Sequence, residues 1–260
     1  METILLATYR RDIRRHLELA QAHGAGLELQ IYGYEPNLLD EGWRDLVVQH
    51  KALLRGFEGA LALHGAFYDL CPASLDRRVA ALARERFLLN LDIAAELGAR
   101  HVVFHTDFIP VVPNPFYRAG WTERQVVFWQ GMVPEIGQRR LTVALENLWE
   151  PQPDIVGQVL DQINSPLLGA CLDVGHCYLY APAHPLADWV AQLSGRLVHC
   201  HLNNHGGRYD DHLPLDAPGG VIRYREDVLP LLNGLATRPW CVLEMDDLEH
   251  LERSLRYLGR

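Results

Sequence analysis

Short apolar runs alternate with longer amphipathic stretches along the whole chain. This alternation is typical of repeated βα units built around a parallel sheet. The short runs are bounded by Gly, Pro or Arg, so we expect buried strands there. The predicted strands are residues 4–7, 27–31, 61–64, 101–105, 141–146, 168–173, 197–201 and 240–244.

The segments between these runs carry apolar residues at helical spacing, most clearly in 74–97. Ser74 is the expected N-cap of that helix and Gly98 its expected C-cap. Two longer segments, 106–120 and 202–223, are predicted to be loops over the C-terminal ends of the strands, where barrel enzymes build their active sites. The other predicted helices are 10–23, 41–54, 121–138, 154–163, 186–193, 224–235 and 247–258.

The length agrees with this pattern, because 260 residues is close to the usual size of about 250 for an α/β barrel. We therefore predict an α/β protein whose residues 1–260 form a single (β/α)8 TIM barrel domain. No run of about 18 apolar residues occurs, which excludes a membrane helix of ordinary length. The start of the chain lacks the pattern of a signal peptide, so we expect a cytoplasmic protein.

Charge and cysteine content narrow the function further. A formal charge of −9 disfavours a protein that holds a nucleic-acid backbone, because such binding needs a basic face. The five cysteines are odd in number and show no CxxC spacing, so we expect buried free thiols rather than disulfides or a thiolate zinc site. The expected partner is a small molecule, and a homo-oligomer is compatible with the sequence.

Metal-ligand side chains stand at the ends of six consecutive predicted strands. Buried apolar strands end in Asp, Glu or His only rarely by chance, and the C-terminal ends of barrel strands face one mouth. Carboxylates crowded there would repel one another unless a cation neutralised them, and these ligand types suit Zn, Mn, Co or Mg. The predicted ligands at the strand ends are His64, His105, Glu146, Asp173, His201 and Glu244.

Further candidates lie in the loops. His176 follows Asp173 in the segment LDVGH, and Asp210 and His212 form a DxH pair in the loop after the seventh strand. Each of these alone could be a surface residue. His199 lies two residues before His201, so we expect it in the barrel interior or behind the ligands.

Four residues are candidates for contact with a substrate. Phe67 and Trp149 could form an aromatic wall for a sugar ring, although packing within their loops is the alternative for each. Glu28 could accept a hydrogen bond from the substrate, or it could be a solvated or paired carboxylate. Arg208 could bind a phosphate or carboxylate, or it could be an ordinary surface arginine.

The residues resemble those of the xylose isomerase-like TIM barrels, a group that includes sugar phosphate isomerases and epimerases and the endonuclease IV-type AP endonucleases. The resemblance covers essentially the whole chain. It rests on the segments LHGAFYDL, VVFHTDF, VALENLWE, CLDVGH, HCHLNNHGGRYDDHLPL and VLEMDD.

In the epimerase branch, the resemblance implies one metal ion held by Glu146, Asp173, His201 and Glu244. It also implies that the two glutamates remove and return a proton next to a carbonyl, while His176 contacts the substrate near the metal.

In the endonuclease branch, the resemblance implies that the same four residues are joined by five more, so that all hold three zinc ions. The acidic charge, the segment 106–108 in place of a proline-glycine turn, and the lack of an arginine in IYGYEPNLLDEG depart from that branch. The additional residues are His64, His105, His176, Asp210 and His212.

The sequence thus favours a metal-dependent isomerase or epimerase of a small sugar, polyol or sugar phosphate, with Glu146, Glu244 and His176 as catalytic residues. The cofactor would be a divalent metal ion, Zn or Mn, with one to three ions in each chain. The alternative is a multinuclear zinc phosphoesterase that cleaves phosphate esters or AP sites. A barrel that binds a ligand without catalysis remains a third class.

Overall fold

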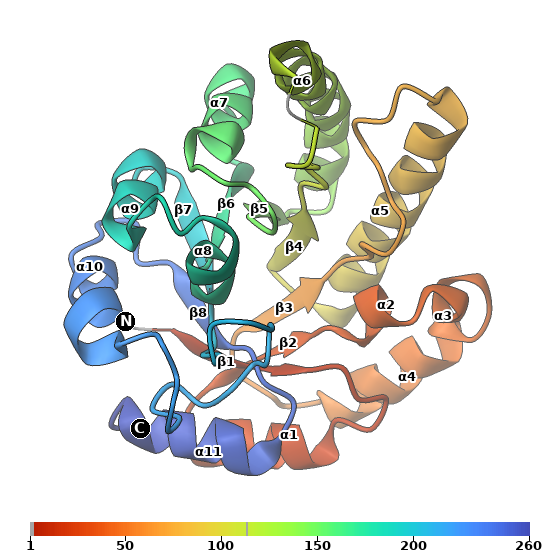
Figure 1. Cartoon of the computed structure of the whole chain (residues 1–260). Helices are drawn as coiled ribbons and strands as arrows, with labels where there is room; N and C mark the ends of the chain where they lie inside the picture. Colours follow the sequence, from red (N-terminus) through yellow and green to blue (C-terminus); the bar gives the residue numbers. More distant parts are fainter. Residues whose placement is uncertain (1–2, 113) are drawn as a thin grey trace.

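The structure is a computed structural model that describes residues 3–112 and 114–260. Its strands form a closed parallel barrel in the order of the sequence, which confirms the predicted fold class. Figure 1 shows the helices as an outer ring around these strands. The strands are β1 (Ile4–Thr8), β2 (Gly26–Leu29), β3 (Leu61–His64), β4 (His101–His105), β5 (Thr142–Glu146), β6 (Leu168–Asp173), β7 (Leu197–Leu202) and β8 (Trp240–Leu243).

The helices follow the strands in alternation, as the amphipathic pattern predicts. Among the described residues, no helix combines the length and the apolar character needed to span a membrane. The prediction that the chain starts without a signal peptide concerns a segment whose residues 1–2 lie outside the described residues. The helices are α1 (Arg14–Ala22), α2 (Ile31–Tyr34), α3 (Pro36–Asp40), α4 (Trp43–Leu53), α5 (Arg77–Leu97), α6 (Pro115–Gln138), α7 (Asp154–Ile163), α8 (Val174–Tyr180), α9 (Leu186–Leu193), the π-helical turn η1 (Tyr224–Val228), α10 (Leu229–Asn233) and α11 (Leu248–Tyr257).

Two layers of side chains stabilise the barrel. The larger layer packs the outward faces of the strands against the helices, with Phe87, Phe104 and Trp129 fully buried and in contact with one another. The second layer consists of two small clusters of strand residues that fill the barrel interior. Ala62 belongs to one of these clusters and Ala144 to the other. The small interior side chains leave room at the mouth for larger polar groups.

Some boundaries differ from those predicted. The second strand ends at Leu29 rather than 31, because the chain turns into α2 at once. The segment 106–120 is only partly a loop, since α6 already begins at Pro115 with Asn114 as its N-cap. The segment 224–235 starts as a π-helical turn before α10, and α2, α3 and α8 lie in segments where no helix is predicted.

The predicted N-cap of α5 is wrong. Asp76, and not Ser74, accepts a hydrogen bond from the backbone N–H of Arg78 at 2.8 Å, and Ser74 instead accepts one from the N–H of Asp76. Both residue types are good N-caps, and the one nearer the first helical turn takes the position. The predicted C-cap is confirmed, because Gly98 has the left-handed φ of 80°.

The capping role of Asp76 gives a simple stability prediction. Asp76→Ala is expected to lower the free energy of unfolding by about 1 kcal/mol, because the N–H of Arg78 loses its partner. Ser74→Ala is the matched control and should cost clearly less. Urea unfolding of both variants tests this, and an equal loss in the two would contradict the assignment of the cap.

Candidate metal centre

A cluster of four buried side chains lies at the C-terminal ends of β5, β6, β7 and β8. The strand register brings them together, because Asp173 pairs with His201 and Glu244 directly follows β8. One ligand atom from each residue lies within 4.8 Å of one from every other. The cluster consists of Glu146, Asp173, His201 and Glu244, which are the four residues predicted for a mononuclear site.

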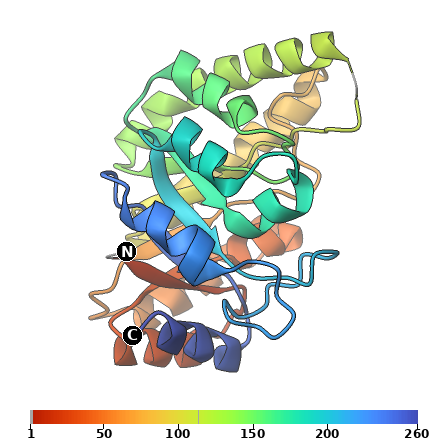
Figure 2. The same cartoon turned by 60° about the vertical axis from the view of Figure 1, so that its left-hand side comes forward.

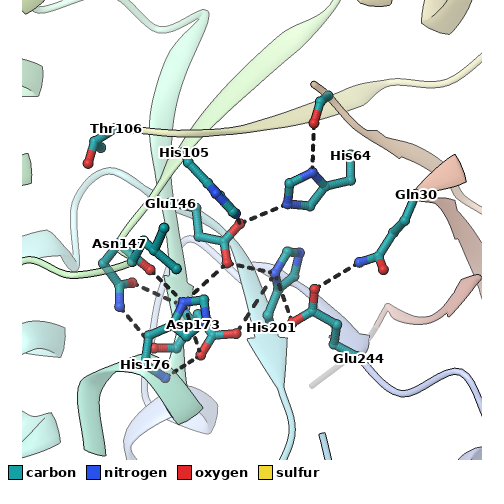
Figure 3. Close-up of polar contacts among 12 residues, drawn as sticks. Gln30, His64, His105, Thr106, Glu146, Asn147, Asp173, His176, His201 and Glu244 are labelled. Carbon is teal, nitrogen blue, oxygen red and sulfur yellow. Dashed lines mark hydrogen bonds and ion pairs between the residues drawn. The ribbon is translucent and has the colours of Figure 1, made fainter. Parts of the chain in front are cut away.

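The Nδ1 atom of His201 is the centre of this cluster. It lies 3.1 Å from Oε1 of Glu146, 3.3 Å from Oε2 of Glu244 and 4.0 Å from Oδ2 of Asp173. Figure 3 shows the carboxylates of Glu146 and Glu244 reaching His201 from two different directions. Three carboxylates therefore converge on one imidazole nitrogen.

The charges of this cluster fit a divalent cation. Burial, together with the neighbouring carboxylates of Glu244 and Glu146, raises the pKa of Asp173 to about 8. Burial also acts to raise the pKa of Glu244, but the imidazoles of His201 and His212 lower it to about 2. Without a cation, Asp173 therefore holds a proton at neutral pH, and a bound divalent ion would take the place of that proton. Three carboxylates and one imidazole suit a hard or borderline ion such as Mn or Zn.

Two further predicted ligands contact the other oxygen of Glu146. The Nε2 atoms of His64 and His105 lie 3.2 Å and 3.3 Å from Oε2 of Glu146. Figure 3 shows Glu146 between these two histidines and the His201 cluster. Glu146 therefore joins two groups of candidate ligands.

The third group comes from helix α8, which directly follows β6, and from the loop after β7. Oδ2 of Asp210 lies 3.2 Å from Nε2 of His176 and 3.2 Å from Nε2 of His212. His212 has a φ of 47°, a conformation uncommon for a residue with a side chain and often found at functional sites. Backbone hydrogen bonds between Asn204 and Leu213 close the base of this loop. Figure 2 shows the loop projecting from the barrel on the right.

A cavity of about 550 Å³ opens above the three groups. Phe67 and Trp149 line it, as predicted, together with the aromatic rings of Tyr34, Tyr68 and Tyr180. Phe67 packs against His105 with ring centroids 4.7 Å apart, whereas Trp149 is 43% exposed and forms part of the rim. The cavity thus has an aromatic wall next to its carboxylates and imidazoles, which suits the two kinds of surface on a sugar.

Two of the four expected substrate contacts lie elsewhere. Glu28 is fully buried in the barrel, with its carboxylate next to His199 and His201, and does not line the cavity. Arg208 is exposed and stacks on the ring of Tyr209, away from the cavity lining. Burial acts to raise the pKa of Glu28, but the imidazoles of His201 and His199 hold it well below its ordinary value. His199 lies in the barrel interior, as expected.

The family follows from a direct comparison. The chain matches the family model of the xylose isomerase-like TIM barrel over residues 17–260. The chain belongs to this family. The resemblance inferred from the strand ends and motifs is therefore confirmed.

Other proteins are similar to this xylose isomerase-like barrel. A solved structure of the TTHB071 protein from Thermus thermophilus, soaked with ZnCl2, is 30% identical, with 98% of this chain and 96% of that chain covered and a TM-score of 0.78. A D-tagatose 3-epimerase-like protein shares the fold at 21% identity, with 99% and 96% covered and a TM-score of 0.82. The protein MJ1311 of Methanocaldococcus jannaschii is 24% identical over 61% of this chain and 56% of its own length. The chain spans about half the length of the curated relatives that it matches.

Two asparagines that contact the candidate ligands were not predicted as site residues. The side-chain NH2 of Asn203 donates to Oδ2 of Asp173 at 3.1 Å and to Oε2 of Glu244 at 3.4 Å. Asn147 accepts a hydrogen bond from the backbone N–H of Asp173 and donates to its carbonyl oxygen. The only signal in the sequence is that each follows a strand closely, because amides are not metal ligands of the expected kind.

Glu150 is a further buried carboxyl that sequence reasoning missed. It accepts hydrogen bonds from the hydroxyl of Thr106 and from the backbone N–H of Leu148. Burial raises its pKa from 4.5 to about 8. The carboxyl thus ties the loop after β4 to the loop after β5, which carries Trp149.

The raised pKa of Glu150 predicts a pH-dependent stability. Between about pH 4.5 and pH 8 the folded chain keeps a proton that the unfolded chain releases, so stability present at low pH is lost as the pH rises. Glu150→Gln has no such proton, so its stability relative to the wild type should rise by up to about 1.4 kcal/mol per pH unit in this interval. Urea unfolding of both proteins at pH 5 and pH 8 measures the change, with the exposed Glu58→Gln as control. If Glu150→Gln and the wild type differ in stability by the same amount at pH 5 and at pH 8, the raised pKa of Glu150 is refuted.

Proposed function

We propose that the protein is a divalent-metal-dependent isomerase or epimerase of a small sugar, polyol or sugar phosphate. The observation that carries the proposal is the convergence of Glu146 and Glu244 on His201 beneath a cavity with an aromatic wall. The family and the likeness to an epimerase-like structure support the same chemistry. We propose Zn or Mn as the ion and residues 1–260 as one catalytic domain.

Glu146, Asp173, His201 and Glu244 would hold the ion. When bound, it supplies a Lewis acid that polarises the carbonyl oxygen of the substrate. Glu146 and Glu244 are both buried, but nearby imidazoles outweigh the effect of burial on their pKa values. The pKa of Glu146 lies well below its ordinary value, and the pKa of Glu244 is lowered to about 2. Each side chain is therefore able to accept a proton at a carboxylate oxygen.

These two glutamates would share the proton transfer. One carboxylate takes the proton from the carbon next to the carbonyl. The other, after it has taken up a proton from water, gives that proton to the opposite face of the carbon, and the first then releases its proton to water. His176 lies 3.6 Å from Oε1 of Glu146 and lines the same cavity, so we propose that it contacts the substrate there. Phe67 and Trp149 would pack against the C–H faces of the sugar.

Solvent exchange tests this function. The protein, supplied with Mn or Zn, is incubated in D2O with a panel of ketoses, polyols oxidised to ketones, and sugar phosphates. We expect deuterium at the carbon next to the carbonyl, detected by NMR and mass spectrometry, together with the epimeric or isomeric product. The absence of exchange into every member of the panel would count against the proposal.

A multinuclear phosphoesterase is the second candidate. A specific observation favours it. His64 and His105 contact Glu146, and His176 and His212 contact Asp210. The additional ligands expected for a multinuclear site therefore lie next to the four-residue cluster or next to one another. This function predicts cleavage of a simple phosphate ester or of DNA with an abasic site, lost in His212→Ala. Deuterium exchange without such cleavage would exclude it.

A further inference from the structure

Glu28 in strand β2 and Gln30, which directly follows this strand, are two buried polar residues under the metal cluster, although none of the candidate ligands comes from β2. Oε1 of Glu28 lies 3.1 Å from Nε2 of His201, and Oε2 of Glu28 lies 2.9 Å from Nε2 of His199. The side-chain NH2 of Gln30 donates to Oε1 of Glu28 at 3.0 Å. Glu28 is thus surrounded by nitrogen groups that can donate to it, as an ionised carboxylate requires.

The two nitrogens of His201 face different partners. Nδ1 faces the carboxylates of Glu146 and Glu244, so an ion held by these carboxylates would take the lone pair of Nδ1. Nε2 would then carry the proton of the ring, and it lies 3.1 Å from Oε1 of Glu28, which can only accept. A carboxylate behind the free nitrogen of a metal-binding imidazole orients the ring in this way.

The same reasoning extends deeper into the barrel. His199 donates from Nε2 to Glu28, so its Nδ1 must accept, and it lies 3.2 Å from Nδ1 of His101. His101 in turn stacks on Trp240 with ring centroids 3.9 Å apart. The ring of His199 is therefore fixed at both nitrogens and holds the second oxygen of Glu28 in place.

Gln30 connects this group to a second ligand. Its NH2 donates one hydrogen to Oε1 of Glu28 and the other to Oε1 of Glu244 at 2.8 Å, which Figure 3 shows as a dashed line. The other oxygen of Glu244 is left facing Nδ1 of His201. The orientation of both ligands thus depends on the same two residues, Glu28 and Gln30.

Two other roles for Glu28 fit the structure less well. Direct contact with a substrate does not fit, because neither Glu28 nor Gln30 lines the cavity, whereas the equally buried Glu146 does. Glu28, His199 and His201 are close enough to be considered as a cation site of their own. However, 2.9 Å between Oε2 and Nε2 is the length of a hydrogen bond with a proton between the atoms.

We propose that Glu28, together with Gln30, is a positioning residue of the metal centre, which orients the ring of His201 from its Nε2 side and fixes the orientation of Glu244. This inference rests on the proposed function in one respect, namely that His201 and Glu244 bind the metal ion. Partners of this kind typically change metal affinity by about 10- to 100-fold when they are lost.

Metal affinity, measured without any substrate, tests the proposal. The wild type, Glu28→Gln and Gln30→Met are stripped of metal and titrated with Mn and with Zn against a competing chelator. We expect the dissociation constant to rise by about 10-fold or more in Glu28→Gln and by a smaller factor in Gln30→Met. Gln30→Met also provides a measurement if Glu28→Gln does not fold.

His50→Gln is the matched control. His50 is also fully buried and makes two hydrogen bonds, to the hydroxyl of Tyr32 and to the backbone carbonyl of Arg11, but it contacts no candidate ligand. Its loss should lower the melting temperature of the metal-free protein and leave the metal dissociation constant unchanged. If Glu28→Gln and Gln30→Met behave in the same way as His50→Gln, their role is structural only and the proposal is overturned. If the wild type binds no metal at all, it is the proposed function that fails.

Discussion

Glu146→Gln and Glu244→Gln are each expected to lower the rate of epimerisation or isomerisation by at least about 100-fold, within the range of about 10²–10⁴ typical of a general acid or base. Glutamine keeps the size of the side chain but cannot accept the proton. In the proposed reaction each carboxylate serves one face of the substrate carbon, so neither is expected to replace the other. The measurement is product formation together with deuterium incorporation from D2O.

A matched control separates this effect from general damage to the protein. Glu58 is an exposed glutamate, and Glu58→Gln should leave the rate unchanged. Both active-site variants should keep the fold, as judged by circular dichroism. Net conversion at the wild-type rate in either active-site variant would show that the two glutamates do not share the proton transfer.

Removal of the metal is expected to abolish activity and to destabilise the protein. An ion that binds only the folded chain stabilises it by about 2.7 kcal/mol at 100 times its dissociation constant. For a chain of this size that corresponds to a rise of roughly 5–10 °C in melting temperature. The expected cause is the crowding of Glu146, Asp173 and Glu244, because a bound ion stabilises all three side chains as carboxylates.

Thermal unfolding with and without a chelator measures this second effect. The shift on adding Mn or Zn back should be large in the wild type and small in Asp173→Asn, which removes one ligand charge. Glu58→Gln should show the full shift. An equal melting temperature for the metal-free and metal-loaded wild type would contradict a metal centre of this kind.

The positions of the candidate ligands could be predicted from the sequence because two independent patterns coincide there. Short apolar runs define buried strands, and a charged or imidazole side chain rarely ends such a run unless it binds a ligand or a polar partner. The parallel barrel then brings the strand ends to one mouth, as seen for Asp173 and His201, which are paired in register. His176 of α8 and the loop residues Asp210 and His212 also lie at the predicted mouth.

The role of Glu28 could not be predicted because alternation along a strand gives the direction of a side chain and not its depth. Glu28 pairs with Ala7 and Ala62, two residues of the barrel interior, and therefore lies below the mouth. Gln30 and Asn203 were not predicted as site residues for another reason. Their amides bind the carboxylates rather than a metal ion, so the ligand pattern does not include them.

Loops were the least predictable part. The exposed side chain of Arg208 follows from the closed base of its loop at Asn204 and Leu213, which no periodic pattern encodes. Similarly, Asp76 and Ser74 are both suitable N-caps, and only the backbone geometry at the start of α5 decides between them.

The metal content of the chain tests the central claim most directly. Elemental analysis of the wild type, His201→Asn and His212→Ala, each loaded with Mn or Zn and then desalted, compares the ligand groups. The account predicts about one ion per chain in the wild type and in His212→Ala, and almost none in His201→Asn, as expected when a ligand of the only tight site is lost. A wild type that retains no ion, or a His201→Asn variant that retains as much as the wild type, would contradict it.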